Sequence, residues 1–271
     1  MEKRVLGIFT CFNRKNKTIS CLESLARNHT IIDFIAVDDG STDGTAEALA
    51  RYDNVTVLNG NGSLFYSGGM RRGIEEAKKR NLDSYDYVMF LNDDVCFFEN
   101  AIDRMISGSD GKSIIVGAMC DDNGNLSYGG AVKTSKYKPS FKNVMSSPEQ
   151  TAYCDTFCAN CVLIPVPVFK KLPNMDKVYI HAMGDFDYGL EASRRGYPIT
   201  ATDFFTGTCN DNPITNTWDD PSLKIRDRLR KKESPKGLPF RDYFHFINKN
   251  YGFLSAVLYS LTPYVRIFLG K

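Results

Sequence analysis

Three consecutive polar side chains, Asn92, Asp93 and Asp94, directly follow the apolar segment 87–91. This segment is short, aromatic and β-branched, which predicts a buried strand. In open α/β sheets, ligands bind outside the carboxyl ends of the strands. Clustered carboxylates repel one another unless a positive charge lies between them, and a hard divalent cation takes oxygen ligands and bridges to phosphates. The alternative is a solvated turn, because Asn and Asp favour turns.

The composition is that of a soluble globular protein, with 42% hydrophobic and 24% charged residues among 271. The net charge of +2 is too small to indicate a basic surface of the kind that binds nucleic acid, so no nucleic-acid partner is expected. No apolar stretch reaches the roughly 18 to 20 residues that cross a bilayer. The first residues run directly into a strand-like segment, so no signal peptide is expected. The eight cysteines are scattered, which favours reduced thiols in a cytosolic protein.

Short apolar runs predict strands, and apolar residues at helical spacing predict helices between them. The expected strands are 5–10, 31–37, 55–58 and 87–91, separated by helices over 17–27, from 45 onward and over 69–80. This alternation predicts a mostly parallel, doubly wound α/β sheet. Polar residues follow each of these strands, and the strand ends meet at one edge of such a sheet. We therefore expect the polar groups to gather at that edge.

The alternation is weaker in the second half of the chain. The expected strands there are 114–118, 157–165 and 199–202, with helices over 100–107, 168–172 and 184–196 and a polar loop over 135–150. The composition changes again after residue 212. A basic stretch is followed by an aromatic and apolar one with scattered cations, which predicts a helical region, 213–271, in a membrane interface. The alternatives are a helix packed on the domain or against the partner in a homodimer.

Several motifs together resemble a known family. They lie at 9–14, 37–45, 66–70, 91–94 and 184–188, and read FTCFNR, VDDGSTDGT, YSGGM, LNDD and GDFDY. Their order and spacing over roughly residues 4–210 resemble inverting family 2 glycosyltransferases of the GT-A fold. The segment 234–239 resembles the tail of bacterial rhamnosyltransferase-like members that build surface polysaccharides.

The resemblance implies a donor site for a nucleoside diphosphate sugar. Carboxylates at its base and ribose end accept hydrogen bonds from a base N–H and from sugar hydroxyls. Glycines let the backbone approach the donor, and an arginine, Arg71 or Arg72, holds a phosphate or sugar oxygen unless both lie on an exposed helix face. The implied donor-binding residues are Thr10, Phe12, Arg14, Asp38, Asp39, Gly68, Gly69, Arg72, Asn92 and Asp93.

The resemblance also implies a divalent cofactor, Mg²⁺ or Mn²⁺. Asn92 occupies the first position of the family's Asp-x-Asp motif, so Asp94 is the expected metal ligand and Asn92 faces the donor. Family members often supply a further histidine after the last strand, whereas residues 208–211 read TCND here. A third protein ligand is therefore not expected from this segment.

Inversion by direct displacement requires one base that takes the proton of the acceptor hydroxyl. The family places an Asp at a helix start, and the matching residue is Asp185. Asp187 lies two positions on, so it points away from Asp185 on a helix. The alternative role for Asp185 is a helix cap. His181 lies nearby and is an acceptor-site candidate together with Asp187, or a loop histidine without a role.

The expected domains are a GT-A catalytic domain over 1–212, with a nucleotide-binding half at 1–98 and an acceptor half at 99–212, and the C-terminal region. The expected activity is transfer of a sugar, with rhamnose from dTDP-rhamnose as a candidate, to a glycan or lipid-linked glycan. The expected location is cytoplasmic, peripheral on the inner face of the cell membrane. The rivals are a sugar nucleotidyltransferase, whose usual glycine-rich loop is missing at 11–15, and a non-catalytic sugar-nucleotide-binding module.

Overall fold

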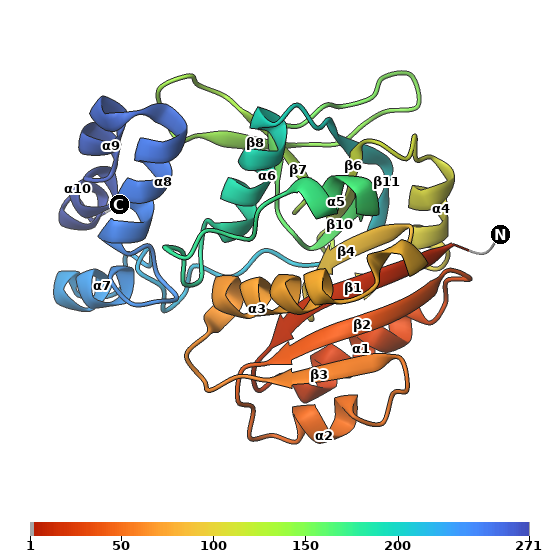
Figure 1. Ribbon diagram of the computed structural model, residues 1–271. Helices are drawn as coiled ribbons and strands as arrows, with labels where there is room; N and C mark the ends of the chain where they lie inside the picture. The colour runs from red at the N-terminus through yellow and green to blue at the C-terminus, as the bar shows by residue number, and fades with distance from the viewer. Residues whose placement is uncertain (1–2, 271) are drawn as a thin grey trace.

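The computed structural model describes residues 3–270, and an eight-stranded sheet lies at the centre of this part of the chain (Figure 1). The strand order is β3-β2-β1-β4-β10-β6-β11-β5. These strands are β1 (Arg4–Cys11), β2 (Ile31–Asp38), β3 (Val55–Asn59), β4 (Tyr87–Leu91), β5 (Cys96–Phe97), β6 (Ile114–Cys120), β10 (Cys161–Pro165) and β11 (Ile199–Thr208).

Helices cover both faces of the sheet, because its strands are apolar on both sides. On one face α3 packs Met70 and Ile74 against Ile8 of β1, and on the other α1 packs Leu22 against Phe9 of the same strand. The helices on the first face are α3 (Phe65–Lys79), α5 (Val166–Lys171) and α6 (Gly184–Arg194), and those on the second are α1 (Lys15–Leu25), α2 (Thr45–Leu49) and α4 (Ala101–Ser107). A short 3₁₀ helix, η1 (Leu82–Ser84), precedes β4.

The first four strands are all parallel, which confirms the predicted doubly wound α/β sheet. β11 is also parallel to its neighbour β6, whereas β10 runs antiparallel between β4 and β6 and β5 runs antiparallel to β11. The carboxyl ends of β1, β2 and β4 therefore point toward the same edge. That edge is where the loops with the predicted polar groups begin.

A second, three-stranded sheet holds β8 (Phe141–Val144), β7 (Gly130–Lys133) and β9 (Thr156–Phe157) in that order. The expectation of a continuous loop over 135–150 was wrong, because Phe141 packs its ring 5.0 Å from that of Phe186 and anchors β8. The expected strand 157–165 is two strands, β9 and β10, in different sheets. The polarity of a segment does not reveal a partner that lies far along the chain.

The C-terminal region is helical, as expected, and consists of α7 (Ile225–Lys232), α8 (Phe240–Tyr251), α9 (Phe253–Tyr259) and α10 (Thr262–Phe268). α8 buries Phe246 and Ile247 in a cluster with Tyr179 and with Leu190 of α6. Figure 1 shows α9 and α10 on the outer side of α8, remote from β3. Among residues 3–270, no helix combines the length and the apolar character that crossing a membrane requires.

Candidate active site

A cleft of about 580 Å³ lies where the loops after β1, β2 and β4 meet the loop before α6. This is the position at which α/β sheets bind ligands. The structure brings together nine of the residues selected from the sequence, and all nine line this cleft. They are Thr10, Phe12, Arg14, Asp39, Asn92, Asp93, Asp94, His181 and Asp185.

The remaining selected residues, Asp38, Gly68, Gly69, Arg72 and Asp187, lie outside the lining of the cleft. Asp38 is buried, and its carboxylate accepts hydrogen bonds from the backbone N–H and the hydroxyl of Ser41, which closes the turn after β2. Arg72 donates to the backbone carbonyl of Asn59. Both side chains are used by contacts within the fold.

Gly68 and Gly69 make close contacts with protein side chains. A Cβ atom at Gly69 would lie 2.3 Å from Oγ1 of Thr10, and one at Gly68 would lie 3.3 Å from Cβ of Leu64. Glycine at position 69 therefore lets α3 pack closely against β1, which holds Thr10 at the cleft. The resemblance implied an approach of this backbone to the donor, whereas the contacts assign it to helix–strand packing.

Asp39 holds the loop that follows β3. Its carboxylate accepts hydrogen bonds from the backbone N–H groups of Gly62 (2.9 Å), Leu64 (3.2 Å) and Phe65 (2.8 Å). These three backbone donors satisfy the acceptor capacity of the buried carboxylate from one loop. Asp39 therefore fixes the start of α3 at the cleft and presents negative charge there.

Asp93 and Asp94 share one cation, Arg14. The guanidinium Nη1 of Arg14 lies 2.8 Å from a carboxylate oxygen of Asp94 and 3.3 Å from one of Asp93. Asp93 is buried and also accepts a hydrogen bond from the hydroxyl of Thr18. Burial raises the pKa of Asp93 to about 6, and the charge of Arg14 opposes that rise. Asp94 is the more exposed of the two carboxylates.

The donor set fits a metal ion that shares its ligands with a substrate. Within residues 3–270, no cluster of three or more His, Cys, Asp or Glu side chains could hold a metal ion by itself. Mg²⁺ and related hard cations are commonly held by one or two carboxylates, waters and substrate phosphates, and the cleft-lining carboxylate of Asp94 meets that requirement. Cys209, after the last strand, lines the cleft, but burial raises the pKa of its thiol to about 11. This thiol is therefore protonated near neutral pH when no cation lies beside it.

Asp185 enters the cleft from the start of α6. Gly184 permits this, because a Cβ there would lie 2.4 Å from Oγ of Ser67 in α3. The carboxylate of Asp185 accepts hydrogen bonds from the backbone N–H groups of Ala159 (3.1 Å) and Phe186 (2.8 Å). Burial raises its pKa above the ordinary value, against these hydrogen bonds. A raised pKa suits a carboxylate to proton transfer near neutral pH.

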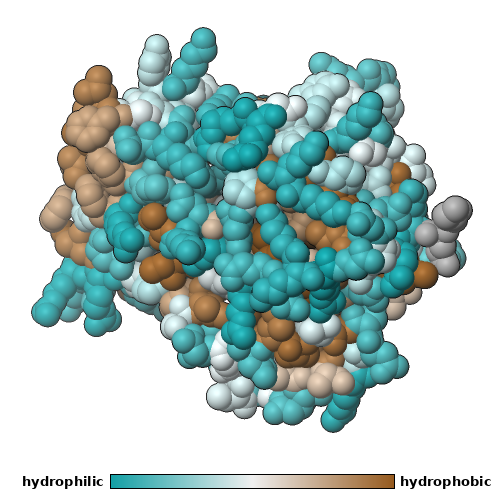
Figure 2. Space-filling view, viewed as in Figure 1, coloured by the Kyte–Doolittle hydropathy of each residue, from teal (hydrophilic) through white to brown (hydrophobic). Residues whose placement is uncertain are grey.

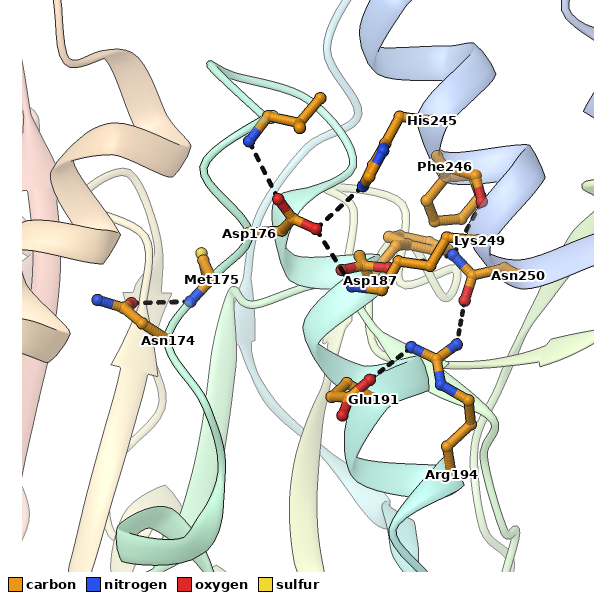
Figure 3. A network of polar contacts seen from close by, with 12 residues as sticks. Asn174, Met175, Asp176, Asp187, Glu191, Arg194, His245, Phe246, Lys249 and Asn250 are labelled. Atoms are coloured by element: carbon orange, nitrogen blue, oxygen red, sulfur yellow. Dashed lines mark hydrogen bonds and ion pairs between the residues drawn. The ribbon is translucent and has the colours of Figure 1, made fainter.

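Asp187 does not line the cleft, and its side chain points toward α8 (Figure 3). Its carboxylate accepts hydrogen bonds from the ammonium of Lys249 (2.7 Å) and the amide of Asn250 (3.1 Å). Lys249 also reaches Asp176 at 3.4 Å, and His245 lies 3.0 Å from the same carboxylate. These contacts link α6 to α8, and they leave Asp185 as the carboxylate of α6 that faces the cleft.

His181 lies between aromatic rings at the cleft wall. Its ring centroid is 6.3 Å from that of Phe65 and 6.4 Å from that of Tyr66, both edge-on. Burial lowers the pKa of His181 to about 4, with further lowering by the charges of Lys236 and Arg14. In the described part of the chain, its buried Nδ1 and the buried hydroxyl of Tyr66 have no hydrogen-bond partner. Both residues line the cleft with a buried polar atom that has no partner within the fold.

Sequence reasoning did not select the other lining residues of the cleft, among them Tyr66, Tyr128, Phe186 and Lys236. Tyr66, Phe186 and Lys236 fall inside motifs that the resemblance had drawn attention to, at 66–70, 184–188 and 234–239. Tyr128 lies in a turn-rich stretch that contains no sequence motif pointing to a functional residue. Their side chains reach the cleft through long-range packing, which no spacing rule describes.

The comparison with family models identifies the chain. The model described as Glycosyl transferase family 2 matches residues 8–163, more than half of the chain. The chain belongs to glycosyl transferase family 2. It is a glycosyltransferase of the nucleotide-sugar type, and its mostly parallel sheet is the GT-A fold. A comparison with curated proteins by sequence gives no match.

Solved structures share this family member's fold at low sequence identity. A mannosyltransferase from Pyrobaculum calidifontis, solved with GDP-Man and Mn²⁺, has a TM-score of 0.57 at 11% identity and covers 100% of this chain and 74% of its own. Residues 1–349 of Staphylococcus aureus TarS have a TM-score of 0.57 at 15% identity, covering 98% and 80%. The same TarS segment with UDP has a TM-score of 0.54 at 15% identity, covering 93% and 72%.

Proposed function

We propose that this glycosyltransferase inverts the anomeric centre as it moves a sugar from a nucleoside diphosphate sugar to a hydroxyl of a glycan or lipid-linked glycan. The supporting observation is that Asp39 and Asp94, from two loops, and Asp185, from the first turn of α6, line one cleft. Asp39 and Asp94 flank the strand ends where a nucleotide and its diphosphate would lie. Asp185 belongs to the opposite wall, where an acceptor would enter.

Asp185 acts as the base in this proposal. It takes the proton of the acceptor hydroxyl as the oxygen forms a bond to the anomeric carbon, and the bond from that carbon to the diphosphate oxygen breaks. The nucleoside diphosphate leaves with the bonding electron pair. The raised pKa of Asp185 makes its carboxylate a stronger base than a solvated aspartate.

Asp94 would hold the divalent ion of this site, and Asn92 would face the donor. Mg²⁺ or Mn²⁺ bound there would neutralise the diphosphate and stabilise it as a leaving group. In the structure, Arg14 pairs with Asp94. With a cation beside Asp94, the guanidinium would be free to turn toward the donor phosphates, which it fits as a bidentate donor. Asp93 keeps its buried contact with Thr18 and supports the loop.

The finer assignment is rhamnose from dTDP-rhamnose, in the synthesis of a bacterial surface polysaccharide. It is supported by the likeness of segment 234–239 to rhamnosyltransferase-like tails. The structural neighbours were solved with GDP-Man and with UDP. A panel of nucleotide sugars therefore has to include donors that carry thymine, guanine and uracil.

We also propose that the C-terminal region rests on the cytoplasmic face of the cell membrane. Exposed apolar side chains of α9 and α10 form a patch, which Figure 2 shows as hydrophobic atoms at the left of the molecule, next to hydrophilic ones. The adjoining α7 segment carries exposed cations at Lys224, Arg226 and Arg230. An apolar face beside cations suits an interface with anionic lipid. The apolar patch consists of Phe253, Leu254, Val257, Leu258, Leu261, Val265, Phe268 and Leu269.

The test begins with thermal shifts against uridine, thymidine and guanosine diphosphate sugars, because a ligand that binds the native state raises its melting temperature. With the donor so identified, Asp185→Asn should retain donor binding and lose about 10²- to 10⁴-fold in turnover, the range typical of a lost general base. Asp83→Asn, an exposed carboxylate remote from the cleft, is the matched control and should keep full turnover.

Two outcomes contradict the proposal. Release of pyrophosphate from a nucleoside triphosphate and a sugar phosphate would identify a nucleotidyltransferase. Donor binding with no release of nucleoside diphosphate by the unmodified chain, across a panel of glycan and lipid-linked acceptors, would identify a binding module.

A further inference from the structure

Lys236 brings a positive charge from the C-terminal region into the donor cleft. It lies on the turn between α7 and α8, more than 130 residues from Asp94 in sequence, and it lines the same cleft. Its ammonium is 6.0 Å from the centre of the Phe12 ring. Its charge, with that of Arg14, also contributes to the lowered pKa of His181, after burial. Lys236 therefore lies between the loop after β1, which carries Phe12, and the loop before α6, which carries His181.

Lys236 differs from Arg14 because its charge is not used within the fold. Arg14 is paired with Asp93 and Asp94. Among the described residues, the ammonium of Lys236 has no ion pair or hydrogen bond, and it lies near the Phe12 ring. An incoming diphosphate adds negative charge to a cleft that already contains four carboxylates. A free cation at its rim offsets that repulsion.

The turn that presents Lys236 is fixed by its own hydrogen bonds. The backbone N–H of Gly237 donates to Ser234 (2.9 Å), and that of Leu238 donates to Lys232 (2.9 Å). The buried ammonium of Lys232 donates to the carbonyl of Leu238 (2.8 Å) and pairs with Glu233 (2.7 Å). The backbone that carries Lys236 is therefore fixed at the cleft by contacts within the C-terminal region.

We propose that Lys236 binds the diphosphate of the donor and of the departing nucleotide, so that the C-terminal region completes the donor site. This inference rests on the proposed function, because it needs a nucleoside diphosphate in the cleft. The chemical class it recognises is a pyrophosphate attached to a nucleoside. The region beyond residue 212 then contributes to binding of the donor as well as to any membrane contact.

The test compares calorimetric affinities of the unmodified chain, Lys236→Met and Lys236→Arg for nucleosides, nucleoside monophosphates and nucleoside diphosphates of uracil, thymine and guanine, with Mg²⁺ present. For the base that binds, Lys236→Met should weaken the diphosphate about tenfold, the lower end for a hydrogen bond to a charged group. Affinity for the nucleoside should not change, and Lys236→Arg should restore most of the loss. The difference should shrink at high salt, because the site is at the rim.

The matched control is Lys224→Met, an exposed lysine of the same basic segment that lies outside the cleft lining. It should bind the diphosphate as the unmodified chain does. Equal diphosphate affinity of Lys236→Met and the unmodified chain would overturn the inference and leave the proposed function standing. An equal loss for nucleoside and diphosphate would also overturn it. If the unmodified chain binds no nucleotide of the panel, the proposed function fails, and the inference fails with it.

Discussion

Two aspartates of α6 have opposite surroundings although they are two positions apart. Asp187 is buried and bonded to Lys249 and Asn250 of α8. Asp185 accepts only backbone N–H donors, and burial raises its pKa. The environment of each carboxylate, rather than its type, is what supports the proposed role of Asp185 as the base.

The raised pKa of Asp185 predicts opposite effects of pH on activity and on stability. Turnover should fall as pH drops through that raised value, because a base must be ionised. The stability linked to this group is full below the unfolded value near 3.8 and is lost as pH rises through the folded value. At pH 7, Asp185→Asn should therefore have a higher melting temperature than the unmodified chain. The difference between the two melting temperatures should be smaller near pH 4.

The matched variant for this measurement is Asp187→Asn, which weakens the contact with Lys249 and should melt lower at pH 7. Calorimetric melting of both variants from pH 4 to 8 provides the readout. A lower melting temperature for Asp185→Asn at pH 7 would contradict the raised pKa.

At the scale of elements, α8 supports the wall that holds His181 and Asp185. Figure 3 shows Asp176, at the start of that wall, and Asp187 both facing α8. Lys249 bridges the two carboxylates, and the carboxylate of Asp242 accepts a hydrogen bond from the backbone N–H of Ile180 (3.3 Å). Helix α8 therefore fixes a loop that lies more than 60 residues earlier in the chain.

Lys249→Met should lower the free energy of unfolding by about 1–3 kcal/mol, because Asp187 is left buried without its cation. The double variant Lys249→Met with Asp187→Asn should recover part of that loss, since no buried charge remains. Denaturant unfolding of the single variants and the double variant forms the cycle. Strictly additive effects would show that Lys249 and Asp187 do not interact.

At the scale of the whole molecule, the donor cleft and the apolar patch are joined through the C-terminal region. Glu233 accepts hydrogen bonds from Tyr264 of α10 and from the backbone N–H of Phe240 (3.1 Å). The same segment, three residues later, presents Lys236 to the cleft. A surface that binds α10 would therefore lie against the segment that presents Lys236 to the cleft.

The proposed membrane contact predicts that Leu254→Glu with Leu258→Glu abolishes sedimentation with anionic vesicles, because both side chains are exposed, at 78% and 66%. Melting temperature should hardly change. The control is Tyr137→Glu, which alters a side chain that is 72% exposed on the β7–β8 connection and should sediment normally. A monomer that binds no vesicles before mutation, or a dimer that the double variant dissociates, would contradict the membrane assignment.

Local patterns in the sequence determined the central architecture. Alternating strands and helices in the first hundred or so residues predicted the parallel half of the sheet, and the position of Asp39 and Asp94 after strands placed them at one edge. These features depend on neighbours within a few positions, because side-chain periodicity and turn preferences are local properties.

Only the tertiary structure decided which groups share the cleft and which are used elsewhere. Asp38 closes a turn, Gly69 packs on Thr10, and Lys236 arrives from a distant segment. Each outcome depends on a contact between residues far apart in the chain. The spacing of residues along one segment carries no information about such a partner, so long-range packing, rather than local pattern, selected the members of the site.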